Sequence, residues 1–154
     1  MEIEDILETD SVVSCLKVTS KKQALKELSD KASTTIGRSE REIFDVLLER
    51  ERLGTTGVGD GIAIPHGKIA GLDRLFGFFA RLEHPIQFDA VDGQPVDLIF
   101  MLLAPESAGA AHLKILSRIS RVLRDHTKCD KLRTAPTTEK IYKILTRHIQ
   151  NRAA

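Results

Sequence analysis

Short apolar segments typical of β-strands alternate along this chain with longer segments whose apolar residues recur at helical spacing. Residues 12–18 contain three valines and predict a first strand, because β-branched residues favour extended backbone. Residues 75–82 are rich in phenylalanine, and the apolar residues 96–103 follow the turn signal Asp92-Gly93, so two further strands are expected. Since helices between strands cover both faces of a sheet, the pattern predicts the α/β class: a single domain with a mixed β-sheet flanked by helices on both faces.

Two of the expected helices begin with capping signatures. Ser20 is followed three residues later by Gln23, and Ser39 by Glu42. In such a capping box, the first side chain accepts a hydrogen bond from the backbone of the first helical turn. The first helix is expected to end at Gly37, because glycine readily takes the left-handed conformation of a helix end. The second helix runs toward a glycine-rich segment.

Two more helices are expected in the last third of the chain, over residues 109–124 and 138–149. Between them, residues 134–138 (TAPTT) are expected to form a mobile joint. The core-facing residues expected on the first of these helices are Leu113, Leu116, Ile119, Val122 and Leu123. The sequence leaves the order of the strands open.

The charge and length of the chain exclude several classes of protein. With 23 Lys and Arg against 22 Asp and Glu, the formal net charge is +1, which disfavours a general nucleic-acid binder. The longest apolar run, residues 98–104, is far shorter than the roughly twenty residues of a membrane-spanning helix, so no membrane insertion is expected. The acidic N-terminus does not resemble a secretory signal. We therefore expect one cytoplasmic domain over residues 1–154.

Cysteine and histidine spacing gives no sign of a metal. Cys15 and Cys129 are too few for a disulfide framework and form no CxxC pair, so two reduced thiols are expected. No spacing of histidine and acidic residues resembles HExxH, and neither a metal nor another cofactor is predicted. The histidines expected to be structural or solvated are His84, in a turn before Pro85, His126, after the long helix, and His148, near the C-terminus.

Five glycines within residues 54–67 make this segment the least ordinary in the chain. Gly57, Gly59 and Gly61 alternate as in a nucleotide-phosphate loop, but that fingerprint needs a strand before it and a helix after it. Here a helix leads in and a strand leads out, so dinucleotide and P-loop binding are disfavoured. Three interpretations stay open: amides exposed to a phosphate, a surface for a neighbouring protein, or a tight surface turn.

His66 follows the apolar residues 62–64 and stands between Pro65, which restricts the backbone, and Gly67, which removes bulk. This arrangement presents an imidazole. A neutral imidazole has an ordinary pKa of about 6.5, so near pH 7 it can attack a phosphorus atom without a separate base. His66 is therefore a candidate nucleophile that would form phosphohistidine. The alternative is a structural or solvated histidine.

Phosphoryl transfer also needs cations or hydrogen-bond donors around the nucleophile, because negative charge spreads over the phosphoryl oxygens. Arg50, near the end of the second helix, could supply a bidentate guanidinium. His112, near the start of the long helix, stands where the helix dipole favours an anion. In the alternative interpretation, Arg50 is a solvated helix charge and His112 is a polar group at a helix start.

Three longer segments resemble a known family. RERLGTTGVGDGIAIPHGK (residues 50–68), HPIQFDAVDGQPVDLIFMLLAP (84–105) and AHLKILSRISRVL (111–123) are similar to the enzyme IIA family of the phosphotransferase system, over most of the chain. Within the fructose/mannitol-type class, GDGIAIPHGK and PIQFDAVDGQPVDLIF most resemble the nitrogen-regulatory enzyme IIA branch. The resemblance implies a stand-alone cytoplasmic phosphocarrier.

The resemblance also implies roles for individual residues. His66, in IPHG, would receive a phosphoryl group on a ring nitrogen from a phosphohistidine of a small HPr-like carrier protein. Arg50, the first residue of RERLG, and His112, in AHL, would flank it and stabilise the phosphate, with Arg52 as a rival of Arg50. Asp60 stands where asparagine is expected to be frequent in this branch, and its charge could weaken binding of the phosphoryl dianion.

Two roles of the phosphorylated protein remain open at this point. In the nitrogen-regulatory branch, phosphorylation state would select regulatory targets such as potassium-transport or sensor-kinase proteins, because a phosphate adds about −1.5 to −2 charge at pH 7. The alternative is a sugar-specific enzyme IIA that passes its phosphate to a fructose- or mannitol-type permease component. The identity of the downstream partners and the oligomeric state are left open.

Overall fold

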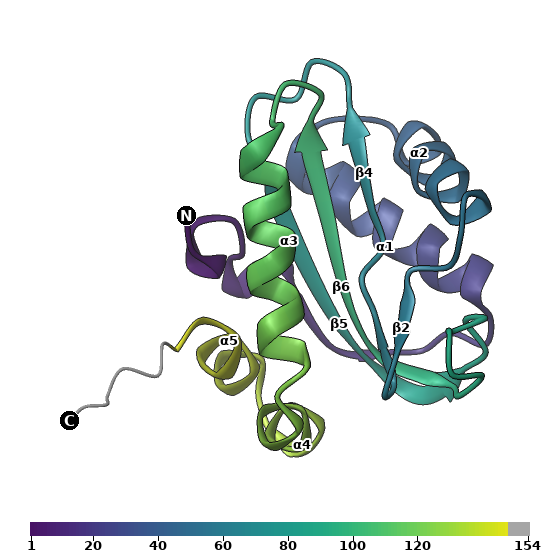
Figure 1. Ribbon diagram of the computed structural model, residues 1–154, viewed down its shortest axis with the longest axis vertical. Helices are drawn as coiled ribbons and strands as arrows, with labels where there is room; N and C mark the ends of the chain where they lie inside the picture. Colours follow the sequence, from purple (N-terminus) through teal and green to yellow (C-terminus); the bar gives the residue numbers. More distant parts are fainter. Residues whose placement is uncertain (148–154) are drawn as a thin grey trace.

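The computed structural model describes residues 1–147 of the chain. Strands form one mixed sheet in the order β1-β5-β6-β3-β2, and β4 also pairs with β6 (Figure 1). The strands are β1 (Val12–Leu16), β2 (Gly57–Gly59), β3 (Ile62–Ala63), β4 (His66–Ile69), β5 (Phe76–Ile86) and β6 (Val96–Pro105). Two short 3-10 turns, Ile3–Asp5 and Thr9–Ser11, precede β1.

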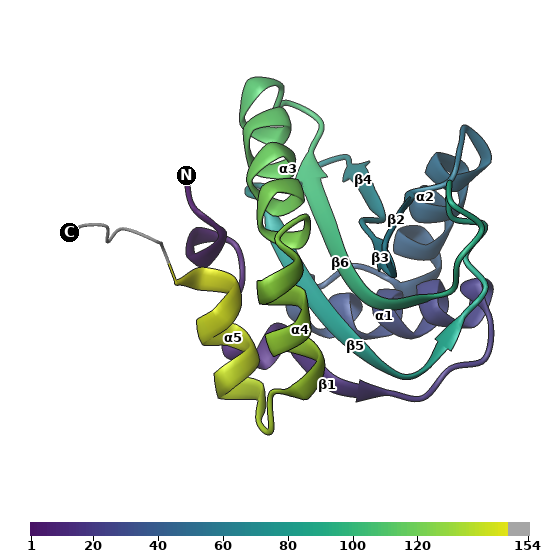
Figure 2. The same ribbon diagram turned by 60° about the horizontal axis from the view of Figure 1, so that its bottom comes forward.

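Helices cover both faces of this sheet, as Figure 2 shows. On one face lie α1 (Lys21–Ile36) and α2 (Glu40–Arg52). On the other face lie α3 (Ala110–Leu123), α4 (His126–Thr134) and α5 (Thr138–Thr146). The predicted fold class, α/β with a mixed sheet between two layers of helices, is confirmed.

The central strand β6 holds the sheet together. It pairs antiparallel with β5 on one edge and parallel with both β3 and β4 on the other. Its side chains alternate between two cores: Phe100 and Leu102 pack under α3 to α5, while Ile99 and Met101 pack under α1 and α2. All four are fully buried, and each such burial contributes about 1.5–3 kcal/mol relative to exposure. A strand covered on both faces explains the continuous apolar run of the sequence.

The backbone around His66 is attached to this central strand. β3 and β4 follow each other along the same edge of β6, and His66, the first residue of β4, lies opposite Leu102. Pro65 fills the gap between the two short strands, and its carbonyl accepts a hydrogen bond of 2.9 Å from the amide of Leu102. The candidate nucleophile therefore stands on paired strand backbone and not on a free loop.

The predicted helix caps are present. Ser20 Oγ accepts a 3.1 Å hydrogen bond from the amide of Gln23, and Ser39 caps α2 in the same way. The Gln23 side chain accepts from the amide of Thr19, one residue before the position that a capping box prescribes. Gly37 ends α1 with a φ of 72°, the left-handed conformation that favours glycine.

The sequence pattern did not predict α4, since only Cys129 and Leu132 among its nine residues are buried. Its start is fixed by Asp125, whose carboxylate accepts a hydrogen bond from the amide of Lys128 at 3.1 Å. An apolar stripe this sparse is too weak a signal to separate a short helix from a loop.

The segment expected to be a mobile joint, residues 134–138, is held between two helices. Ala135 is buried, and its carbonyl accepts a 2.7 Å hydrogen bond from the guanidinium of Arg81 in β5. The next helix starts at Thr138 and its described part ends at Thr146. Residues 148 and 149, the last two of the helix expected over 138–149, lie outside the described residues.

Two side chains differ from the expected pattern. Leu113 is 71% exposed, so the prediction that it faces the core is wrong. His112 takes the inward position on α3 instead, in line with Ile115 and Ile119. The prediction that His84 lies in a turn is also wrong, because this exposed residue is part of β5, where the pairing register with β6 shifts.

Candidate functional site

Close packing of α2 on β4 brings two of the predicted site residues together. A Cβ atom on Gly67 would overlap the side chain of Val46, so glycine is required where the helix crosses the strand. Arg50 follows Val46 by one helical turn and therefore lies beside the residue that precedes Gly67, which is His66. The IPHG motif, which contains His66, and the RERLG motif, which contains Arg50, therefore meet at one point.

The hydrogen bonds of His66 determine which ring nitrogen is free. Its Nδ1 lies 2.9 Å from the carbonyl oxygen of Ile64, and a carbonyl can only accept, so Nδ1 carries the proton. Its Nε2 accepts from Nε of Arg50 at 3.3 Å. The other end of the Arg50 guanidinium donates to the carbonyl of Gly54 at 2.9 Å, which fixes its plane. Nε2 therefore presents a lone pair next to a held cation.

The rival arginine points elsewhere. Arg52 forms an ion pair with Glu49 on the surface of α2, with 3.3 Å between Nη1 and Oε1. Its side chain is 64% exposed, and it lines neither of the hollows beside His66. Arg50 is the arginine that the structure places against His66.

His112 completes the group from the opposite side. It lies in the first turn of α3, and the centroids of its ring and the His66 ring are 5.7 Å apart at an interplanar angle of 78°. The residue is buried, and its Nε2 has no hydrogen-bond partner among the described residues. A buried polar atom without a partner is costly, so the ring has unused capacity to bind a group placed between the two histidines.

Two hollows of about 390 and 200 Å³ lie on either side of His66 and Arg50. His112 and Gly67 line the first hollow; Thr56 lines the second. Large apolar side chains that line them stand exposed: Leu53 at the first hollow and Val58 at the second. The site is thus a shallow opening with an apolar rim.

Burial is the main influence on the two imidazoles. Burial lowers the pKa of His66 below its ordinary value, and the charge of Arg50 lowers it further. The hydrogen bond to Ile64 and the charge of Glu51 act in the opposite direction and raise it. Burial likewise lowers the pKa of His112, with further lowering by His66 and Lys68. Both rings are therefore neutral at pH 7, and the His66 lone pair is available for attack.

Glu51 is a buried carboxylate, missed in the sequence analysis, that is connected to His66 through a series of hydrogen bonds. Glu51 forms a 2.9 Å ion pair with Lys21 and accepts hydrogen bonds from both the amide, at 3.0 Å, and the hydroxyl of Thr56. The carbonyl of Thr56 accepts from the amide of Ile64 at 2.9 Å, and the Ile64 carbonyl holds Nδ1 of His66. This series of bonds, which we call the Glu51 relay, connects the Glu51 carboxylate to the backbone of Ile64, whose carbonyl sets the tautomer of His66. Its only sequence signal is a charge on the apolar side of a helix.

The glycine-rich segment contains a tight turn, one of the three interpretations left open. β2 and β3 form a hairpin whose turn residues Asp60 and Gly61 both have positive φ, as an Asp-Gly hairpin turn requires. The amide of Asp60 donates to Asp92 and, with that of Gln94, holds the pKa of this carboxyl below its usual range. The Asp60 carboxylate lies 3.6 Å from Nε2 of His126 and lines neither hollow beside His66.

The unpredicted helix α4 holds this hairpin through Arg133. Its guanidinium pairs with Asp97 of β6 at 2.8 Å and donates to the carbonyl of Asp60 at 3.0 Å. A Cβ atom on Gly61 would come within 2.8 Å of both side chains, so glycine is needed there as well. Nothing in the spacing of the sequence indicated this contact, which joins residues far apart along the chain.

The other sequence candidates lie apart from this group. His84 and His126 are exposed, while His148 lies outside the described residues. Cys15 and Cys129 are free cysteines, and Cys129 is buried, which raises its pKa. Among residues 1–147, no three His, Cys, Asp or Glu side chains gather in a way that could hold a metal ion. Within the same residues, every helix is too short or too polar to cross a membrane.

Comparison with known proteins connects this geometry to one family. Residues 5–148 match the family described as "Phosphoenolpyruvate-dependent sugar phosphotransferase system, EIIA 2". The chain belongs to this family. Its members are phosphotransfer proteins, and the resemblance drawn from the IPHG and RERLG motifs is confirmed.

Similar proteins carry the name of the nitrogen-regulatory branch. The chain is 55% identical over 145 residues to the "Nitrogen regulatory protein" of Bradyrhizobium diazoefficiens, covering 94% of this chain and 95% of the relative. It is 41% identical over 147 residues to that of Escherichia coli, covering 95% and 90%. The crystal structure of nitrogen regulatory protein IIA-Ntr from Neisseria meningitidis matches with a TM-score of 0.90 at 39% identity, over 94% of this chain and 99% of that one. The chain is thus a nitrogen-regulatory type of enzyme IIA.

Proposed function

We propose that this enzyme IIA is a phosphocarrier that accepts a phosphoryl group on Nε2 of His66 from a phosphohistidine of a small HPr-like carrier protein. The observation that supports the proposal most directly is the hydrogen bond from Nδ1 to Ile64, because it leaves Nε2 as the nitrogen with a lone pair. The lowered pKa of His66 keeps this lone pair unprotonated at pH 7.

The transfer step needs no base and no metal. The lone pair of His66 Nε2 forms a bond to phosphorus while the bond from phosphorus to the donor imidazole breaks, and its electron pair returns to the donor ring. His66 keeps its proton on Nδ1, so the phosphorylated ring becomes formally cationic. The Ile64 carbonyl, at 2.9 Å, and the charge of Glu51 both favour that ring cation. The exchange between two imidazoles is nearly balanced and therefore reversible.

Arg50 and His112 act on the transferred group in this proposal. The Arg50 guanidinium donates to Nε2 at 3.3 Å before transfer, and the same N–H can turn to a phosphoryl oxygen as the lone pair is used. Protonated on Nε2, His112 would donate to a second oxygen, which would satisfy an atom that lacks a partner among the described residues. Stabilisation of developing charge by fixed donors is the main source of rate in phosphoryl transfer.

The carrier would dock on the apolar rim around the two hollows. Leu53 is 85% exposed, and Val58 is 52% exposed. Exposed side chains of this size near a reacting group are typical of protein contact surfaces.

Phosphorylation would then select the partners of this cytoplasmic domain, spanning residues 1–154. A phosphate carries a charge of about −1.5 to −2 at pH 7, which would reverse the local potential beside Arg50. We infer that the targets are regulatory proteins of nitrogen or potassium metabolism, such as potassium-transport or sensor-kinase proteins, and the names of the similar proteins support this choice over a sugar permease.

Intact-mass measurement tests the proposal. The protein is mixed with phosphoenolpyruvate, enzyme I and an HPr-type carrier, and mass is read under alkaline conditions that preserve phosphohistidine. We expect a gain of one phosphate, lost in His66→Ala and kept in the matched variant His84→Ala, which removes an exposed histidine of β5. Nitrogen-15 NMR of the phosphorylated ring should assign the phosphate to Nε2.

The outcomes separate the alternatives. Acceptance of phosphate by His66→Ala at the normal rate would overturn the nucleophile, and phosphate on Nδ1 would overturn the role of the Ile64 bond. Transfer onward to a fructose- or mannitol-type permease component would favour a sugar-specific enzyme IIA. Equal affinity of regulatory partners for both forms would exclude the switch.

A further inference from the structure

The formal net charge of +1 conceals a strong division of charge along the chain. Residues 1–104 carry 12 Lys and Arg against 18 Asp and Glu, a net charge of −6. Residues 105–154 carry 11 Lys and Arg against 4 Asp and Glu, a net charge of +7. Such asymmetry creates a local potential that the overall balance does not reveal.

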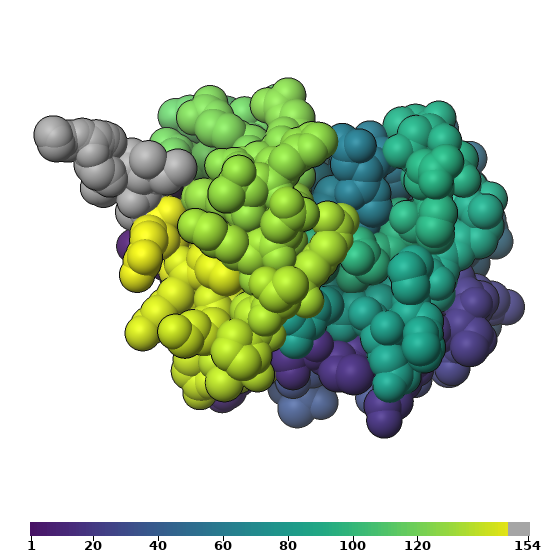
Figure 3. All heavy atoms as spheres, turned by 90° about the horizontal axis from the view of Figure 1, so that it is seen from below, coloured from purple at the N-terminus to yellow at the C-terminus, as the bar shows by residue number. Residues whose placement is uncertain are grey.

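Much of this positive charge gathers around a groove between the end of α3, α4 and α5. Two adjoining hollows of about 290 and 390 Å³ share Asp125, Lys128 and Arg147 as lining residues. We call them together the C-terminal groove. Figure 3 shows α4 and α5, coloured yellow-green to yellow, as one continuous area of surface. The cationic residues that line the groove are Arg118, Arg121, Lys128, Lys131, Lys140, Lys143 and Arg147.

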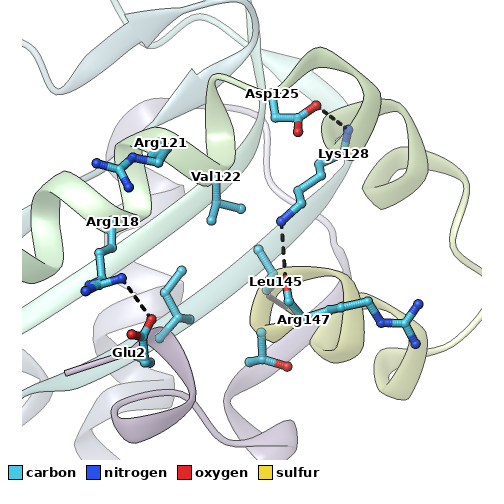
Figure 4. A pocket seen from close by; sticks show the side chains of 10 residues that line it. Glu2, Arg118, Arg121, Val122, Asp125, Lys128, Leu145 and Arg147 are labelled. Atoms are coloured by element: carbon cyan, nitrogen blue, oxygen red, sulfur yellow. Dashed lines mark hydrogen bonds and ion pairs between the residues drawn. The ribbon is translucent and has the colours of Figure 1, made fainter. Parts of the chain in front are cut away.

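The charges stand along both sides of an apolar strip. In Figure 4, Arg118 and Arg121 lie on α3 along one side of the first hollow, and Lys128 and Arg147 lie along the other. The charged ends of Arg121 and Arg147 point away from each other, whereas Arg118 reaches Glu2 and Lys128 reaches the carbonyl of Arg147, so the four do not converge on one point. The apolar lining residues that offer surface are the half-buried Val122 in the first hollow and Ile144 in the second, above the buried Ile3 and Leu145.

Several of these cations lack an ionic partner. Arg118 pairs with Glu2 at 3.0 Å, and Lys128 donates to the carbonyl of Arg147 at 3.4 Å. By contrast, the exposed side chains of Arg121 and Lys143 form no ion pair with any residue in the described part of the chain, and the same holds for Lys131 and Lys140. Unpaired like charges gathered on one face repel each other, so an anionic partner would relieve them.

We propose that the C-terminal groove binds an acidic amphipathic helix of a partner protein. Cations on two opposite walls match carboxylates on both flanks of a helix, and the apolar strip between them matches its apolar face. A compact phosphate would require donors that converge, as Arg50 and the two histidines do at the other site. The groove does not involve His66, so binding here is separate from phosphoryl transfer and its test does not depend on the proposed function.

Fluorescence anisotropy with a designed probe tests the groove. The probe is a labelled helical peptide of about 15 residues, with leucines at spacings of three and four and glutamates on both flanks. We expect saturable binding that weakens with added salt. Arg121→Glu/Lys143→Glu should raise Kd by about tenfold or more, because each reversal replaces an attraction with a repulsion. His66→Ala should bind the peptide as the unchanged protein does.

Matched controls make the result decisive. Lys22→Glu/Lys31→Glu makes the same change of net charge at exposed residues of α1, on the opposite face of the sheet, and should leave Kd within about twofold. Equal loss in both double variants, or equal binding of a peptide with lysine in place of glutamate, would overturn the proposal. So would tighter binding of a single-stranded oligonucleotide to the same residues, or self-association of the protein that Arg121→Glu/Lys143→Glu abolishes in sedimentation velocity.

Discussion

The site at His66 and the C-terminal groove both present cations, but they hold them differently. Arg50 is fixed by bonds to His66 and to the carbonyl of Gly54, whereas Arg121 and Lys143 stand exposed in the groove. A fixed guanidinium loses little freedom when it binds a small group in transit, and that suits catalysis. Exposed cations on flexible stems suit the broad surface of a partner. If both proposals hold, this difference separates a place for phosphoryl transfer from a place for partner recognition.

The largest effect expected is the loss of the nucleophile. His66→Gln keeps a polar side chain of similar size but has no ring nitrogen, so phosphate acceptance should fall below detection in intact-mass measurements. Binding of the acidic probe peptide in the groove should not change. Loss of both properties together would contradict the separation of the two regions.

The next effect tests whether a fixed cation matters more than a positive charge. Arg50→Lys keeps the charge but cannot hold both Nε2 of His66 and the carbonyl of Gly54 in one plane. We expect the rate of acceptance to fall on the order of 10²-fold. Arg52→Lys is the matched control and should stay within about twofold, since its partner Glu49 is also exposed. Equal acceptance rates for Arg50→Lys and Arg52→Lys would contradict the view that a fixed guanidinium matters more than a positive charge.

A smaller effect is expected from the Glu51 relay. Glu51→Gln keeps the shape but removes the charge that pairs with Lys21 and raises the pKa of His66. The free energy of unfolding should fall by about 1–3 kcal/mol, measured by chemical denaturation, and the acceptance rate should fall about tenfold. The pH profile distinguishes a role of Glu51 in positioning His66 from a role in stability alone. If Glu51 positions His66, the apparent pKa of His66 should be lower in this variant than in the unchanged protein.

The titration of His66 gives a more modest but direct measure of its environment. Because burial lowers its pKa, the NMR midpoint of the ring should lie below the ordinary 6.5. The unfolded chain then binds more protons than the folded chain between these two values, so the free energy of unfolding should decrease as pH falls below 6.5. His66→Gln should flatten this dependence, and a midpoint at or above 6.5 would contradict the assignment of the neutral ring.

The smallest effect is expected at Asp60. Its carboxylate lies beside His126 and lines neither hollow at the site, so Asp60→Asn should change the acceptance rate by no more than about twofold. Stopped-flow or quenched mass measurements resolve such a difference. A rise of tenfold would support the hypothesis that this charge weakens binding of the phosphoryl dianion.

The sequence predicted the parts of the molecule that rest on local patterns. The caps at Ser20 and Ser39 and the strand alternation are visible within a few residues, and they set the fold class. His66 and Arg50 were predicted from long and specific motifs, and the structure joins the two side chains by a hydrogen bond. Glu51 was missed because its importance arises from burial and from contact with Thr56 and Lys21, which no spacing reveals.

The missed elements share a physical cause. α4 buries few apolar side chains, so its periodicity was too weak to detect. Arg133 acts through contacts with Asp97 and the hairpin turn, which are distant in sequence. Leu113 was assigned to the core because leucine is usually buried, whereas on α3 the inward position belongs to His112. A histidine in a core stripe is the kind of departure from pattern that marks a functional position.

The pairing of β4 with β6 has a consequence for how the molecule could signal. His66 lies opposite Leu102 of β6, a strand buried on both faces, but within the described residues β4 itself pairs with β6 alone, so β4 can open locally while β5 and β6 stay paired. Amide hydrogen exchange should therefore be slowest at β6, which is paired on both edges, and faster at β4, with or without phosphate. The molecule would report its state as a change of surface charge on a sheet whose centre stays paired, and a partner would have to read that charge directly.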